Sequence, residues 1–167
     1  VYECAECWTT WSRPPGSYDK QCRDPFVEWD AATARWLLFA TAKSTNGFGV
    51  VTVASSADLY RWTGAGFIDA TRRLPHGIGA QTTGGQAENA FVMSKDGVHY
   101  LLFTDWQDSE DACSVPNPRT IVQYAFSRSL AVDSLGSAAW VYGGSIPDPG
   151  VNAIEVQVLD GRTWVMS

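Results

Sequence analysis

Long apolar runs and an excess of basic side chains are both missing from this 167-residue chain. No stretch approaches the roughly 18 continuous apolar residues that a membrane-spanning helix requires, so we expect no membrane partner. Acidic residues outnumber basic ones by 18 to 12, which gives a net charge of −6. Because nucleic-acid backbones require a basic protein face, we also expect no nucleic-acid partner. A basic N-terminal region followed by an apolar run is missing too, so any secretion signal is expected to have been removed.

Charged residues are also scarce, at 18% of the chain against 45% apolar residues, which excludes a disordered chain and a solvated coiled coil. Aromatic residues are abundant instead, with 8 Trp, 6 Tyr and 7 Phe beside 15 Gly and 8 Pro. This balance is typical of an all-β protein with many turns. At this length we expect a single domain with a substantial core.

The cysteines are few but even in number, at Cys4, Cys7, Cys22 and Cys113. An even count in an acidic, Trp-rich chain favours a secreted or extracellular protein with one or two disulfides. The alternative is a zinc site on Cys4, Cys7 and Cys22, which lacks a second Cys-x-x-Cys or a nearby histidine pair. We therefore favour a disulfide, and we expect no metal and no cofactor.

Short apolar runs separated by turn residues predict strands throughout the chain, and no amphipathic helical window is present. Two Asp-Gly pairs, at 96–97 and 160–161, are strong hairpin signals. The predicted strands are Phe26–Trp29, Arg35–Thr41, Phe48–Ser55, Ala90–Met93, Val98–Thr104, Thr120–Phe126, Ala153–Val158 and Arg162–Met166.

An internal repeat connects these strands, because Trp36, Tyr100 and Trp164 follow one another at intervals of 64 residues in similar apolar runs. Four strands per unit at a fixed period indicate β-propeller blades of four antiparallel strands. The chain then holds about two and a half blades: 22–85, 86–150 and a partial blade over 151–167. Residues 1–21 precede the repeat as an N-terminal segment, for which we consider a role in completing a blade.

The start of each innermost strand of a propeller lies at the central channel, where residues of different blades converge. Asp24, Glu88 and Asn152 each lie 12 residues before the aromatic residue of their repeat. Opposed carboxylates are what glycoside hydrolysis needs, one protonated and one ionised.

The segments Arg23–Val27, Ser55–Trp62 and Ala87–Val92, the last followed by Lys95–Phe103, resemble the five-bladed propeller glycosidases. This group includes arabinanases, arabinofuranosidases, β-xylosidases, invertases and levansucrases, and the resemblance covers about residues 22–167. It implies a glycoside hydrolase acting on furanosyl or pyranosyl linkages, with Glu88 as the general acid and Asp24 as the stabilising carboxylate. The substrate-binding residues that we expect are Arg23, Asn89, Asn152, Glu155, Trp106 and His76.

The sequence departs from that family in one respect, because a third carboxylate on an earlier blade has no counterpart before Asp24; Asp19 is the nearest carboxylate and has no supporting motif. Structural roles compete as well, since an Asp before Pro often only initiates a turn. Trp36, Tyr100 and Trp164 are expected to pack within blades, and His99 is expected to be structural.

Two functions therefore stand side by side: a glycosidase, and a non-catalytic carbohydrate-binding or structural half-propeller. Either form has a carbohydrate or structural partner, and two copies would supply about five blades. Two explanations stand side by side: a homodimer that closes a five-bladed ring, and a fragment of a longer propeller.

Overall fold

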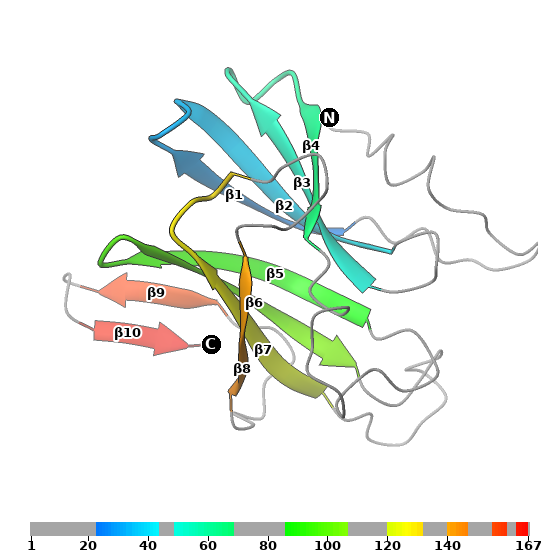
Figure 1. The fold of residues 1–167 in the computed structure, drawn as a ribbon, viewed down its shortest axis with the longest axis vertical. Helices are drawn as coiled ribbons and strands as arrows, with labels where there is room; N and C mark the ends of the chain where they lie inside the picture. The colour runs from blue at the N-terminus through cyan, green and yellow to red at the C-terminus, as the bar shows by residue number, and fades with distance from the viewer. Residues whose placement is uncertain are drawn as a thin grey trace, which may run out of the picture.

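The computed structural model of this chain describes residues 23–43, 49–68, 86–106, 120–131, 140–146, 155–159 and 163–166. All regular structure in these ranges is β-strand (Figure 1), which confirms the predicted all-β class. The ten strands are β1 (Arg23–Asp30), β2 (Arg35–Lys43), β3 (Gly49–Ser56), β4 (Thr63–Ile68), β5 (Gln86–Lys95), β6 (Val98–Trp106), β7 (Thr120–Ser127), β8 (Val141–Ile146), β9 (Val156–Leu159) and β10 (Thr163–Met166). Among these described residues there is no helix long and apolar enough to cross a membrane.

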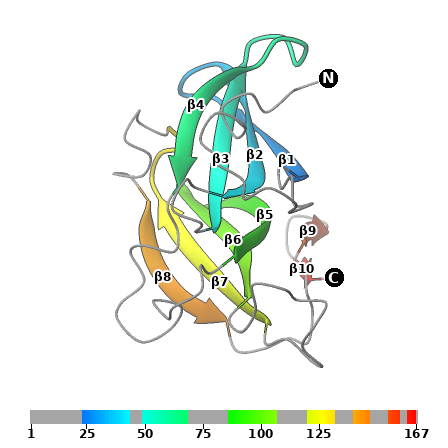
Figure 2. The same cartoon turned by 90° about the vertical axis from the view of Figure 1, so that its right-hand side faces the viewer.

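The strands form two four-stranded antiparallel sheets and one hairpin. Sheet 1 has the order β1-β2-β3-β4 and sheet 2 the order β5-β6-β7-β8, so each strand pairs with its neighbour in sequence. The hairpin β9–β10 lies beside β5 on the other side of sheet 2 from sheet 1 (Figures 1 and 2). Two successive four-stranded sheets are consistent with the predicted blades.

Turn chemistry explains the first hairpin of each sheet. Between β5 and β6, Asp96 and Gly97 both have positive φ, 52° and 74°, as a two-residue type I′ turn requires. Between β1 and β2 the turn 31–34 is longer, and Asp30 accepts hydrogen bonds from the Ala32 amide (3.1 Å) and the Thr33 hydroxyl (2.6 Å). The Asp-Gly hairpin predicted at 96–97 is therefore confirmed.

The two sheets carry the same irregularities at corresponding places. Asp24 in β1 and Asn89 in β5 both have φ of 54°, and each begins a β-bulge in its strand. The glycines Gly66 in β4 and Gly144 in β8, with φ of 137° and 131°, lie at matching bulges. The internal repeat thus exists in three dimensions as well as in the sequence.

This correspondence corrects the alignment drawn from the 12-residue spacing. By the position of the bulge, Asp24 corresponds to Asn89, and Glu88 corresponds to Arg23. The error arises because the turn 31–34 is longer than the turn 96–97. Relative to the 64-residue period, the longer turn moves β1 one way along the sequence against β5 and moves β2 the other way against β6.

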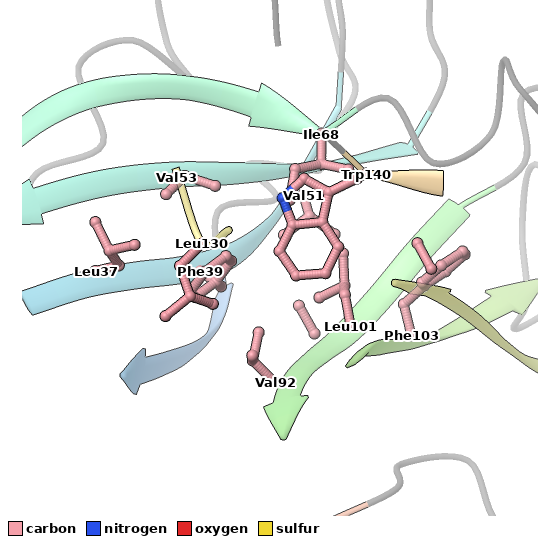
Figure 3. Close-up of a cluster of buried hydrophobic side chains, with 12 residues drawn as sticks. Leu37, Phe39, Val51, Val53, Ile68, Val92, Leu101, Phe103, Leu130 and Trp140 are labelled. Carbon is pink, nitrogen blue, oxygen red and sulfur yellow. The ribbon is translucent and has the colours of Figure 1, made fainter. Parts of the chain in front are cut away.

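The main core fills the space between the two sheets. Alternate residues of the strands, such as Leu37 and Phe39 of β2 and Leu101 and Phe103 of β6, point into it (Figure 3). The Trp140 ring, at the start of β8, lies among side chains of both sheets and is 2% exposed. The full set is Leu37, Phe39, Val51, Val53, Ile68, Ala90, Val92, Leu101, Phe103, Ala125, Leu130 and Trp140.

Each sheet also has an apolar second face. On sheet 2 the buried residues Leu102 and Val122 pack with half-buried neighbours that include Val156 of β9. On sheet 1 a smaller cluster consists of Leu38, Ala40 and Ala54 with Trp62 packed against it. Both faces of each sheet are therefore apolar, as expected for sheets that stack as layers.

Candidate functional site

The bulges of β1 and β5 lie next to each other, at the start of the first strand of each sheet. The Thr41 hydroxyl of β2 donates a hydrogen bond to Asp24 Oδ2 at 3.1 Å. The same hydroxyl oxygen accepts the backbone N–H of Asn89 at 3.2 Å. Directly after each bulge, the rings of Phe26 and Phe91 are in contact, with centroids 4.7 Å apart. The structure thus brings the predicted residues Asp24 and Asn89 together from different sheets.

The residue types at the two bulges suit their backbone conformation. A positive φ in the left-handed region is disfavoured for most side chains and tolerated by Asp and Asn. Pro25 follows Asp24 within the bulge, where its missing N–H removes no ladder hydrogen bond. The prediction that Asp24 has a backbone role thus has structural support, and this role is compatible with chemistry at its carboxylate.

The backbone conformation explains Asp24 and Asn89, but it does not explain why residue 88 is a glutamate. Glu88 directly precedes the Asn89 bulge, pairs with Thr104 of β6, and is only 7% exposed. Glutamate is rarely buried to this degree in proteins unless its carboxylate has a specific role or partner. Glu88 and Asp24 therefore lie at the same end of the two sheets. The Asp24 carboxylate contacts Thr41 on the side of sheet 1 that faces sheet 2, whereas Glu88 shares with Thr104 the face of sheet 2 that is turned away from sheet 1.

The remaining predicted site residues are placed only partly. Arg23 and Trp106 belong to β1 and β6, but their side chains lie outside the described structure. His76 and Asn152 lie outside the described residues altogether, as do segment 1–21 and the four cysteines. Glu155 precedes β9 directly and is exposed.

Sequence analysis missed two polar residues of this region. Thr41 was counted only as the end of a strand, although it is 1% exposed and connects the two bulges. Glu28 lies opposite Leu37, on the face of sheet 1 that packs against sheet 2, and burial raises the pKa of its carboxyl. A single Glu inside the apolar run of β1 was the only signal for it.

A second polar cluster lies near the other end of β5. Ser94 Oγ and His99 Nδ1 are 2.7 Å apart, across the hairpin of β5 and β6. Burial lowers the pKa of His99, and attraction to the Asp30 carboxylate of sheet 1 partly offsets this. This cluster lies at the opposite end of β5 from Glu88 and Asn89, so it is separate from the paired bulges.

No family model matches this chain, and no curated protein is significantly similar to it. In the part of the chain that the structure describes, no three His, Cys, Asp or Glu side chains gather to hold a metal ion. The paired bulges with Asp24, Glu88 and Asn89 are therefore the feature from which a function is inferred.

Proposed function

We propose that this chain is part of a β-propeller glycoside hydrolase that acts on furanosyl or pyranosyl linkages of an oligosaccharide or polysaccharide. The observation that carries the proposal is the buried Glu88 beside a bulge that is hydrogen-bonded, through Thr41, to the bulge of Asp24. The resemblance of Arg23–Val27 and Ala87–Val92 to the five-bladed propeller glycosidases supports it independently.

The propeller architecture is part of the same proposal. Sheet 1 packs on sheet 2 through a shared core, and sheet 2 packs on the β9 residue Val156 through its other face. Successive four-stranded meanders that stack face to face are the defining arrangement of a propeller. In that arrangement the starts of β1 and β5 lie at the central channel, where a substrate binds.

Glu88 and Asp24 have different roles in the proposed reaction. Glu88, in its protonated form, donates a proton to the oxygen of the glycosidic bond as that bond breaks. Asp24, in its ionised form, stabilises the positive charge that develops on the sugar ring. Water then adds to the anomeric carbon, and the proton that it loses restores the acid form of Glu88. In this proposal Asn89 and Arg23 bind substrate hydroxyls, and a polysaccharide substrate fits the proposed secretion of the protein.

The proposal is tested by replacing Glu88 with Gln, which keeps the shape of the side chain and removes its proton. On aryl arabinofuranosides, xylosides and fructosides we expect turnover to fall about 10²–10⁴-fold. The loss should be largest with a nitrophenyl leaving group and much smaller with dinitrophenyl, because the latter departs without a proton. Asp96→Asn, at an exposed turn position where Asn tolerates the positive φ, is the matched control and should keep native activity.

An equal loss with both leaving groups would show that Glu88 is not the general acid. A native protein that binds these sugars but hydrolyses none of them would favour the second candidate, a non-catalytic carbohydrate-binding propeller. That candidate is favoured by the positive φ of Asp24 and Asn89, because a backbone requirement alone accounts for both residue types.

A further inference from the structure

The Thr41 hydroxyl forms one hydrogen bond to each of the two bulges. A hydroxyl has one hydrogen to donate and two lone pairs that accept. The hydrogen is given to Asp24 Oδ2 at 3.1 Å, and a lone pair accepts the Asn89 N–H at 3.2 Å. The chain of hydrogen bonds therefore runs in one direction, from the Asn89 amide of sheet 2 through Thr41 to the Asp24 carboxylate of sheet 1.

The geometry of Thr41 is restricted by its surroundings and by its own side chain. Thr41 is 1% exposed and forms part of the β2 ladder, paired with Arg23 on one side and Val51 on the other. A β-branched side chain has few accessible χ1 rotamers, and burial prevents the hydroxyl from turning to water. The Thr41 hydroxyl oxygen is thus held in one place between β1 and β5. It contacts Asn89, which lies 48 residues further along the chain.

We propose that Thr41 is a positioning residue, which holds the Asp24 carboxylate against the Asn89 bulge at the start of sheet 2. The catalytic consequence rests on the proposed glycosidase function, whereas the holding itself rests on the two hydrogen bonds. Thr41 has no proposed contact with substrate and acts through Asp24.

The first test measures the holding without any substrate. In Thr41→Val the side chain keeps its shape but loses its acceptor, so the Asn89 amide should exchange with solvent at least about fivefold faster by NMR. Thr41→Ser retains the hydroxyl and should restore slow exchange. Thr52→Val is the matched control, because Thr52 is a buried threonine of the neighbouring strand whose hydroxyl contacts Gly66 O instead. Amides of the core residues Leu101 and Phe39 report any general loss of stability.

The second test measures the catalytic consequence on an aryl glycoside that the native protein hydrolyses. A stabilising carboxylate acts in the transition state, so Thr41→Val should lower kcat about 10–100-fold and leave KM within about threefold. Thr41→Ser and Thr52→Val should keep kcat within about threefold of native.

Each outcome decides one part of the proposal. An Asn89 amide that exchanges at the native rate in Thr41→Val would overturn the holding. Faster exchange with an unchanged kcat would overturn the positioning role while the glycosidase proposal stands. If the native protein hydrolyses no substrate, the proposed function fails, and the exchange rates still decide whether Thr41 holds the two bulges together.

Discussion

Single polar side chains fix how the two sheets meet at each end of their contact. At one end Thr41 connects Asp24 to the backbone of Asn89. Near the other end His99 of sheet 2 is within hydrogen-bond distance of Ser94 and is influenced by the charge of Asp30 in sheet 1. A buried polar contact such as that of Thr41 contributes modestly to stability when satisfied, and its loss is expensive because the orphaned group stays desolvated.

We predict that His99 titrates below its ordinary value of 6.5, because burial disfavours the charged ring more than Asp30 favours it. The unfolded chain then binds the proton more tightly than the folded protein. Stability is therefore fully present above pH 6.5 and decreases as the pH falls from 6.5 through the folded pKa. NMR titration of the imidazole measures the midpoint, and urea unfolding at several pH values measures the slope.

His99→Gln serves two purposes in this experiment. It identifies the His99 signals against those of His76, and it should remove the part of the pH dependence that belongs to His99. A midpoint above 6.5 in the native protein would show that the attraction of Asp30 outweighs burial.

The residues of the candidate site were predictable from the sequence to different degrees. Asp24 and Glu88 were found because a motif and a repeat marked them, and the structure places both at the starts of their sheets. Thr41 was not found, because a threonine in a strand is ordinary and its importance arises from a contact with distant Asn89. Pairing Asp24 with Glu88 by the 12-residue spacing was wrong by one residue, because that spacing does not allow for the longer turn 31–34.

At the scale of strands, local sequence predicted the inner three strands of each sheet better than the outermost one. β4 and β8, with the sequences TGAGFI and VYGGSI, are rich in glycine, which weakens any strand signal. Neither β4 nor β8 is among the strands predicted from the sequence. Pairing with β3 and β7 and the bulges at Gly66 and Gly144 supply what local preference does not.

We predict that Gly143→Ala destabilises the protein by about 1–3 kcal/mol through overpacking. A Cβ at Gly143 would overlap the Tyr124 ring, and Gly143 is not among the residues with positive φ, so contact and not backbone strain is the cause. In sheet 1 the corresponding bulge contains Ala65, and the residue that corresponds to Tyr124 is the smaller Val53.

The repeat itself therefore suggests the compensating change. In a Tyr124→Val background, Gly143→Ala should change the free energy of unfolding little. Urea unfolding of the native protein, the two single variants and the double variant should therefore give a clear coupling free energy. Additive effects of the two substitutions would show that the ring does not restrict this position.

At the scale of the whole molecule, the outer face of sheet 1 has the character of an interface. Val92 and Leu130 of sheet 2 are each 2% exposed because they pack against sheet 1. The corresponding residues of sheet 1, Val27 and Leu59, are 38% and 46% exposed. The number of sheets was predictable from the repeat, but which face each sheet buries was not, because it depends on how the sheets stack.

We predict that a second copy of the chain covers this face. Exposed apolar sheet faces are liabilities that stable proteins cover, and the burial of Val92 and Leu130 shows which kind of neighbour fits. Light scattering on a sizing column should then give twice the 18.2 kDa of one chain. Val27→Lys should convert the dimer to monomer, while Val141→Lys, at a 53% exposed valine of β8, should leave it intact. A stable, folded native monomer of 18.2 kDa would refute this prediction.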